Sequence, residues 1–267
     1  MEHAAAAKPV RRPGPAGSTC SGCGLEAHDG RPCLSIVMPA FNEEASIERA
    51  VREAVAAVNG LVPSYEVVVV DDGSRDATGE QLSHLGKELG DSLVVVRHAE
   101  NRGYGTALRD GFAAARGRLV FYTDADNQFD LRELASAMPL VTDYDAVLGY
   151  RLDRQDPWLR RFVSGGFNRI ARVVLGAAAR DLNCSFKLFR AETLRSLPLA
   201  SEDFFIDTEI VALLRWAGAR CIERGVQHLP RVAGRSTVRP GDVPRTLSSL
   251  VRFWWRLRRL PTPRGRA

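Results

Sequence analysis

The strongest chemical signal in the chain is a pair of aspartates, Asp124 and Asp126, which follow the apolar run 119–122. Two neighbouring carboxylates repel each other unless a cation lies between them. Mg²⁺ and Mn²⁺ prefer oxygen ligands, and Gln128 can add an amide oxygen. The three side chains predict a divalent metal site that would neutralise a departing diphosphate. The alternative for an isolated Asp-x-Asp sequence is a solvated turn.

Polar or glycine-rich residues follow the other apolar runs in the same way. Asp71 and Asp72 end the run 65–70, and their carboxylates can accept hydrogen bonds from ribose hydroxyls or base N–H groups. An alternative for this segment is capping of the next helix by Ser74 or Asp76. The remaining candidates at strand ends are Pro39, Ala40, Asn42, Glu43, Asn101, Gly103, Gly149, Tyr150 and Arg151.

Two glycines near the start of a helical pattern, Gly103 and Gly105, allow the backbone to approach a ligand closely. Together with Arg102 they could face a diphosphate at the N-terminus of that helix. The segment is not a P-loop, because the Lys-Ser/Thr pair is absent, and it lacks the third glycine of a Rossmann fingerprint. A phosphate contact here would therefore differ from both motifs.

Alternating strand and helix patterns must position these residues. The strand patterns are short apolar runs at 34–38, 65–70, 92–96, 119–122 and 146–148. The helical patterns occupy 45–58, 76–89, 106–115 and 130–138. Strands that are apolar on both faces are typical of parallel sheets covered by helices. The alternation predicts an α/β fold with a mostly parallel, Rossmann-like sheet flanked by helices, and ligands bind such sheets beyond the carboxyl ends of the strands.

The second half of the chain ends in a basic, aromatic helical pattern at 243–260. Before it, helical patterns occupy 162–175 and 208–216, and extended patterns occupy 184–190 and 220–229. In the last helix the predicted apolar side comprises Leu247, Leu250, Val251, Trp254, Trp255 and Leu257, and the flanking cations are Arg252, Arg256, Arg258 and Arg259. Tryptophan and arginine at helical spacing predict an interfacial helix on a membrane. Packing on the catalytic domain is the alternative.

The bulk composition fits one large α/β domain. The chain has 267 residues, of which 45% are hydrophobic and 26% charged, and its net charge is +5. We predict a flexible leader at 1–32, a single catalytic domain at 33–241 and a basic amphipathic helix with its tail at 242–267. Seven arginines and no acid occur from Val243 to the end, which favours an anionic membrane surface or nucleic acid as partner. No long apolar run or signal peptide is visible, so we expect a cytoplasmic protein that is peripheral on the inner face of the cell membrane.

Four metal-ligating residues, Cys20, Cys23, His28 and Cys33, have the spacing C-x2-C-x4-H-x4-C. Three thiolates and one imidazole can surround a tetrahedral zinc ion, and the spacing resembles a zinc knuckle. The alternative is a flexible leader with unrelated cysteines, since no aromatic residue is present in the loop to stack on a base.

The motifs taken together resemble family 2 glycosyltransferases of the GT-A fold. The resemblance lies in Ser35–Glu44, Val70–Asp76 and Asp124–Gln128, and Asp181–Arg190 and Phe205–Glu209 extend it. Over roughly residues 34 to 240 the chain is most similar to the branch of dolichol-phosphate mannose synthases and polyprenyl-phosphate glycosyltransferases. The resemblance implies inverting, metal-dependent transfer of a sugar from a GDP- or UDP-sugar to a polyprenyl phosphate of the cell envelope.

The resemblance also implies a role for each candidate. The donor set is Pro39, Ala40, Asn42, Glu43, Asp71, Asp72, Asn101, Gly103 and Asp124. The catalytic set is Asp124, Asp126 and Arg151, and the set for Mg²⁺ or Mn²⁺ is Asp124, Asp126 and Gln128. The acceptor set is Arg151, Ser185, Lys187, Arg231 and Ser236. Two residues depart from the family pattern: Ser185 replaces a glycine and Thr237 replaces a lysine, for which Arg235 or Arg239 could substitute.

Three other functions fit parts of the sequence. A soluble hydroxyl acceptor would usually need a general base, whereas a lipid phosphate is already anionic, and His84, His98 and His228 lie outside the core motifs. The hypothesis of a nucleic-acid-binding protein with a zinc knuckle does not explain the polar and glycine residues that follow the predicted strands. An inactive nucleotide-sugar binder conflicts with the intact Asp124 and Asp126. Since many relatives carry transmembrane helices, a membrane partner protein is a further candidate.

Overall fold

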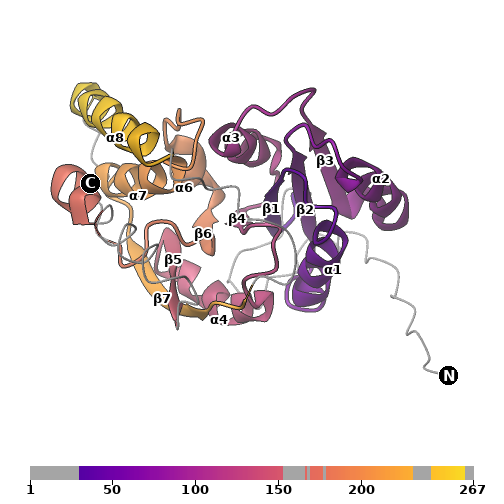
Figure 1. The fold of residues 1–267 in the computed structure, drawn as a ribbon. Coiled ribbons are helices and arrows are strands. Elements are labelled where there is room, and N and C mark those ends of the chain that lie inside the picture. The colour runs from indigo at the N-terminus through magenta and orange to yellow at the C-terminus, as the bar shows by residue number, and fades with distance from the viewer. Residues whose placement is uncertain (1–29, 153–165, 167–168, 177–178, 231–241, 262–267) are drawn as a thin grey trace.

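The computed structural model describes residues 30–152, 166, 169–176, 179–230 and 242–261 (Figure 1). These residues form a seven-stranded sheet with the strand order β3-β2-β1-β4-β6-β5-β7. The strands are β1 Leu34–Ala40, β2 Tyr65–Asp71, β3 Leu93–Arg97, β4 Leu119–Tyr122, β5 Ala146–Leu152, β6 Lys187–Arg190 and β7 Cys221–Gln227.

The sheet is parallel except at β6. This strand pairs antiparallel with both neighbours, so that Lys187 lies between Tyr122 of β4 and Leu148 of β5. The other neighbouring pairs of the sheet are parallel. The carboxyl ends of six strands and the amino end of β6 therefore meet at one edge.

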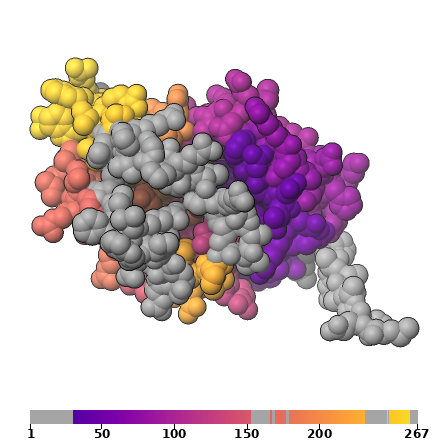
Figure 2. All heavy atoms as spheres, viewed as in Figure 1, coloured from indigo at the N-terminus to yellow at the C-terminus, as the bar shows by residue number. Residues whose placement is uncertain are grey.

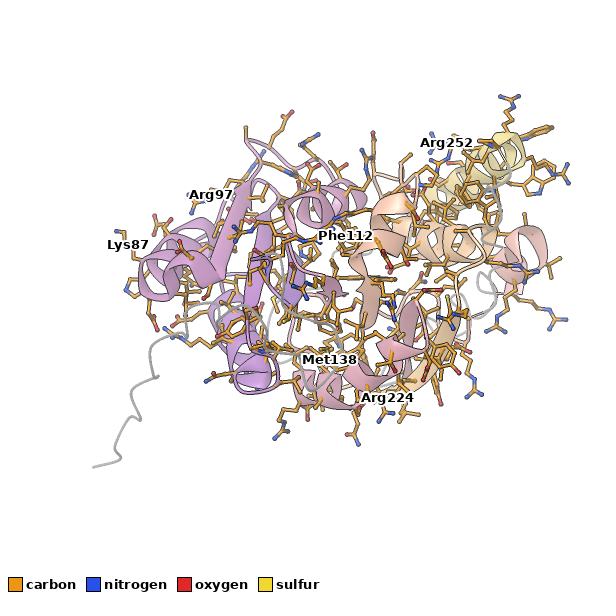
Figure 3. The ribbon with its side chains drawn as sticks, turned by 180° about the vertical axis from the view of Figure 1, so that it is seen from behind. Lys87, Arg97, Phe112, Met138, Arg224 and Arg252 are labelled. Atoms are coloured by element: carbon orange, nitrogen blue, oxygen red, sulfur yellow. The ribbon has the colours of Figure 1, made fainter. Side chains whose placement is uncertain are left out.

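Helices cover both faces of the sheet. They are α1 Ile47–Val58, α2 Thr78–Leu89, α3 Tyr104–Ala114, α4 Leu134–Ala137, α6 Ala191–Ser196, α7 Ile206–Trp216 and α8 Asp242–Arg259, with 3-10 turns at Gly90–Ser92, Leu131–Glu133 and Met138–Thr142. The side chains of β1 alternate between two cores: Ile36 and Met38 pack with α1, α2 and α4, while Val37 packs with α3, α6, α7 and α8. Phe112 and Met138 mark these two cores in Figure 3. Burial on both faces explains why the strands read as continuous apolar runs.

The predicted α/β fold is confirmed, and each predicted strand and extended segment overlaps an observed strand. The pattern at 130–138 was predicted to be helical, and residues 131–142 are helical. They form a 3-10 turn, the short α4 and a second 3-10 turn instead of one regular α-helix, and α4 ends before Pro139, which has no N–H to donate. The short helix α6 was not predicted, because six residues give too little periodicity.

Some predictions fall on residues that the structure does not describe. Residues 1–29 and part of 162–175 are among them. The division at 32 and 241 stays a prediction. In the part of the chain that is described, no helix has the length and apolar character required to cross a membrane.

Helix α8 packs on the domain with one side. Leu250 and Phe253 are buried in the core, and Trp254 and Leu257 pack against it. Val251 and Trp255 are instead 53% exposed. The predicted single apolar side is therefore divided between the core and the surface.

Candidate active site

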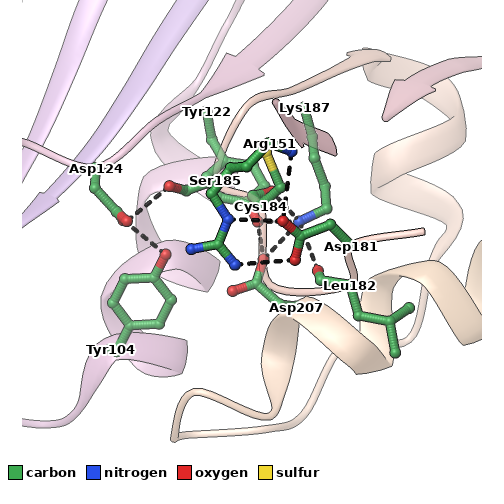
Figure 4. Close-up of polar contacts among 10 residues, drawn as sticks. All are labelled: Tyr104, Tyr122, Asp124, Arg151, Asp181, Leu182, Cys184, Ser185, Lys187 and Asp207. Carbon is green, nitrogen blue, oxygen red and sulfur yellow. Dashed lines mark hydrogen bonds and ion pairs between the residues drawn. The ribbon is translucent and has the colours of Figure 1, made fainter. Parts of the chain in front are cut away.

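Asp124 lies just beyond β4, and both oxygens of its carboxylate accept a hydrogen bond from a hydroxyl (Figure 4). Tyr104 donates to Oδ1 at 2.8 Å, and Ser185 donates to Oδ2 at 2.7 Å. Burial and the negative charge of Asp126 raise the pKa of Asp124. Burial and the charge of Asp124 also raise the pKa of Tyr104, which keeps its phenol a donor. The orientation of the carboxylate is thus fixed by two residues from distant parts of the chain.

Asp126 and Gln128 continue the same turn. Asp126 is buried, and its carboxylate accepts a hydrogen bond from the backbone N–H of Gln128 at 3.2 Å. The side-chain nitrogen of Gln128 donates to the carbonyl of Leu229 at 3.4 Å, so the amide oxygen is the end that could bind a cation. Two neighbouring carboxylates, of which Asp126 raises the pKa of Asp124, and one amide oxygen form an oxygen donor set that suits Mg²⁺ or Mn²⁺.

The protein ligands alone do not complete a metal shell. Among the described residues, no group of three or more His, Cys, Asp or Glu side chains could hold a metal ion. Mg²⁺ commonly takes one or two carboxylates and completes its shell with water and substrate phosphates. The site therefore fits a metal that binds together with a diphosphate.

Arg151 lies at the end of β5 and forms a two-point ion pair with Asp181. Its Nε is 2.6 Å from Oδ2 and its Nη2 is 3.0 Å from Oδ1 of that carboxylate. The two side chains are 10% and 6% exposed. A guanidinium held at two points is suited to binding phosphate in a defined orientation.

Lys187 was predicted to contact the acceptor, but its side chain is engaged inside the fold. The side chain is fully buried, and its ammonium donates to Tyr122, to Asp207 at 2.8 Å and to the carbonyls of Leu182 and Cys184. Burial lowers the pKa of Lys187 to about 8 and raises the pKa of Asp207. Lys187 thus holds the turn that carries Ser185 through the carbonyls of Leu182 and Cys184 (Figure 4).

Asp72 was predicted to bind the donor, but its carboxylate is engaged within the fold. It accepts hydrogen bonds from the backbone N–H groups of Arg102 at 2.8 Å and Gly103 at 2.9 Å. It also lies 2.6 Å from Nδ1 of His98, whose Nε2 is 3.0 Å from Asp110. His98, which lies outside the core motifs, therefore helps to hold Asp72. Nothing in the spacing of these residues indicated that contact.

The other predicted donor residues lie at the same edge of the sheet. Asn42 accepts a hydrogen bond from the backbone of Arg75 and donates its own N–H to Ser74, so the loops after β1 and β2 interlock. Asp71 is buried and accepts from the backbone of Ser74 at 3.0 Å. Pro39, Ala40 and Glu43 belong to the end of β1 and its loop, and Asn101 is exposed in the loop after β3.

Several candidates lie outside the described residues. They are Arg231, Arg235, Ser236, Thr237 and Arg239 of the acceptor segment, and Cys20, Cys23 and His28 of the zinc candidate. Cys33, the fourth zinc candidate, is 1% exposed and belongs to the hydrophobic core. This burial does not favour its use as a zinc ligand.

Comparison of the sequence with known protein families agrees with the geometry of this site. A model of the family described as Glycosyl transferase family 2 matches residues 35–197. The chain belongs to glycosyl transferase family 2. In this family 2 chain the matched region contains Asp124, Asp126, Arg151 and Ser185 but ends before α7 and α8.

Two curated relatives carry names that indicate chemistry. Glycosyltransferase AglD of Haloferax volcanii is 35% identical over 239 residues, which are 84% of this chain and 37% of that protein. The undecaprenyl-phosphate 4-deoxy-4-formamido-L-arabinose transferase of Edwardsiella ictaluri is 31% identical over 204 residues, 76% of this chain and 62% of that protein. The chain thus spans less than two thirds of the length of either relative.

Solved structures support the GT-A fold expected for the family. Glucosyl-3-phosphoglycerate synthase from Mycobacterium tuberculosis, in complex with Mn²⁺ and UDP-glucose, superimposes with a TM-score of 0.64 at 23% identity. The alignment covers 84% of this chain and 79% of that one. At this identity the likeness establishes the fold.

Proposed function

We propose that the chain is a metal-dependent, inverting glycosyltransferase that moves a sugar from a UDP- or GDP-sugar to a polyprenyl phosphate. The observation that carries the proposal is the turn after β4, where Asp124 and Asp126 lie next to each other and Ser185 and Tyr104 fix the first carboxylate. The names of the undecaprenyl-phosphate transferases and of the synthase with bound Mn²⁺ and UDP support the acceptor and the donor.

Each residue of the site has a task in this reaction. Asp124, Asp126 and Gln128 would hold Mg²⁺ or Mn²⁺, which neutralises the charge of the leaving diphosphate when bound. Arg151, fixed by Asp181, would orient an anionic phosphate. A phosphate acceptor is already a nucleophile and needs no general base. His98 is accordingly not needed as a base, and both of its ring nitrogens contact carboxylates, those of Asp72 and Asp110.

A second acceptor class is a soluble molecule that carries a hydroxyl group. Solved structures of the Mycobacterium tuberculosis synthase contain phosphoglyceric acid together with UDP and Mn²⁺. We rank this class second for the present chain, because curated relatives above 30% identity carry the name of an undecaprenyl-phosphate transferase.

The proposal is tested by a donor screen with the purified chain. UDP-glucose, GDP-mannose and related donors are offered with Mn²⁺ or Mg²⁺ and a short polyprenyl phosphate. The parallel acceptors are the matching polyprenol and 3-phosphoglycerate. We expect a glycosylated lipid phosphate, no product from the polyprenol and loss of transfer with EDTA. Transfer to 3-phosphoglycerate alone would favour the soluble acceptor, and the absence of transfer from every donor would contradict the proposal.

The proposed acceptor lies in a membrane, and the outer side of α8 suits a membrane surface. Val251 and Trp255 are exposed beside Arg252, Arg258 and Arg259, and Arg252 lies on α8 at the edge of the molecule (Figure 3). The helical residues 169–175 add exposed apolar side chains at the same end (Figures 1 and 2). No acid occurs in 169–175 or in α8 after its first residue, Asp242, which fits anionic lipid. We therefore propose peripheral attachment to the inner face of the cell membrane, with a membrane partner protein as the alternative occupant of this surface.

Replacing Val251 and Trp255 together with serine is expected to weaken binding to anionic vesicles about tenfold or more, because two apolar anchors are lost. Deleting residues 243–267 would also remove Leu250 and Phe253 from the core, so the double substitution is the cleaner change. Co-sedimentation with phosphatidylcholine vesicles, with and without phosphatidylglycerol, measures the effect. A thermal melt checks folding, and unchanged binding by a folded variant would reject the membrane surface.

A further inference from the structure

The segment 198–205, between α6 and α7, lies between α8 and α3 (Figure 1). On the α8 side, Arg256 donates to the carbonyl of Pro198 at 2.7 Å and forms an ion pair with Glu209. Ser249 donates to Asp203 at 2.9 Å. Helix α8 therefore holds the segment near both of its ends.

The ion pair with Arg256 holds the middle of the segment indirectly. Glu209 is fully buried, and its carboxylate accepts hydrogen bonds from the backbone N–H groups of Ala200 at 3.1 Å and Ser201 at 2.8 Å. A buried carboxylate is costly without a cation beside it. Loss of Arg256 would leave Glu209 uncompensated and would release the backbone that it holds.

On the α3 side, the segment contacts the backbone of the loop that precedes α3 and of the first turn of that helix. Gly105 donates its N–H to the carbonyl of Glu202 at 2.9 Å. A Cβ atom at Gly103 would lie 2.5 Å from the oxygen of Glu202, and one at Gly105 would lie 2.5 Å from the oxygen of Ser201. The two glycines are thus needed for this contact, and a shift of the segment must move Gly103 and Gly105.

Tyr104 lies between these glycines and links the segment to the metal site. Its ring stacks on Phe204 with centroids 5.0 Å apart, and its hydroxyl donates to Asp124 at 2.8 Å. Asp72 holds the other side of the loop through the N–H of Gly103. A continuous series of contacts therefore runs from α8 to the carboxylate of Asp124.

We infer that α8 is a positioning element of the metal and donor site, and that Arg256 and Ser249 act as positioning residues through segment 198–205 and Tyr104. The inference deepens the proposed function and rests on it for the identity of the ligands. Neither residue belongs to the part of the chain matched by the family model. Helix α8, for which membrane attachment is proposed, would thus also set the geometry of the turn that contains Asp124 and Asp126.

The test compares Arg256→Ala and Ser249→Ala with the full-length wild-type chain. Hydrogen exchange followed by mass spectrometry reports the peptide covering 101–108, and calorimetry reports the binding of Mn²⁺ with UDP or GDP. We expect exchange at 101–108 to be about tenfold faster in Arg256→Ala, since a charged hydrogen bond is lost, and the affinity for Mn²⁺ and nucleotide to fall by a similar factor. Ser249→Ala is the milder change and is expected to shift both quantities about threefold.

Arg195→Ala is the matched control. Arg195 donates from α6 to the carbonyls of Ala115 and Gly117, which precede β4 at the opposite edge of the sheet. Its loss should reduce thermal stability without changing exchange at 101–108 or the affinity for Mn²⁺. Unchanged exchange at 101–108 in both α8 variants would overturn the inference. Absence of Mn²⁺ and nucleotide binding in the wild type would instead contradict the proposed function, while the exchange data would still decide whether α8 positions the loop.

Discussion

Asp126→Ala is expected to lower sugar transfer about a hundredfold to a thousandfold, because the enzyme loses one of the two carboxylates proposed to hold the cation at the diphosphate. Asp126 lies in the turn after β4 beside Asp124, whose pKa it raises through its negative charge. Removing Asp126 relieves that repulsion, so the stability of the folded state should not decrease. Initial rates over a series of Mn²⁺ concentrations measure the effect, and circular dichroism confirms folding.

The control for this substitution is Asp130→Asn in the same stretch of chain. Asp130 pairs with the exposed Arg132 and caps a 3-10 turn, and asparagine preserves the cap. Its rate should stay close to that of the wild type. If Asp126→Ala also turned over at a near-normal rate, Asp126 would not be a metal ligand.

Lys187→Met is expected to lower the free energy of unfolding by about 3–5 kcal/mol, because it leaves the buried Asp207 without its cation. The ammonium also holds Tyr122 and the carbonyls of Leu182 and Cys184, which lose their donor at the same time. A loss of this size is a large part of the stability of a typical domain. Urea denaturation followed by fluorescence gives the free energy.

A double substitution separates the ion pair from general damage to the core. Lys187→Met combined with Asp207→Asn removes both charges, so the double variant should be more stable than the sum of the single losses predicts. Lys87→Met, a change at the surface of α2, should alter the free energy by no more than about 0.5 kcal/mol. Simple additivity of the two buried substitutions would show that Lys187 and Asp207 do not stabilise each other.

The strands and the edge that carries the candidate site could be predicted because their signals are local. Runs such as 65–70 and 119–122 are apolar on both faces, which identifies buried parallel strands. Parallel strands end at a common edge, so Asp71, Asp124 and Arg151 were expected near one another. The type of helix at 130–138 was not predictable from periodicity alone, because short 3-10 turns and α-helix have similar apolar spacing.

The roles of Lys187, Asp72 and His98 could not be predicted, because they depend on contacts between distant segments. Lys187 is close in sequence to the predicted acceptor residues, yet it lies inside the fold with Asp207. His98 lies outside every motif, yet it contacts the carboxylate of Asp72. Residue type and spacing show which groups can ionise but not which of them are buried together.

The sequence by itself determined the α/β architecture, the edge of the sheet at which the candidate residues gather and the carboxylate pair at Asp124 and Asp126. Only the tertiary structure decided what surrounds that pair. The antiparallel strand β6 inserts between β4 and β5, and this brings Ser185 to Asp124 and Asp181 to Arg151. Strand order and direction follow from the packing of the whole sheet, whereas apolar periodicity reports only which faces of each strand are buried.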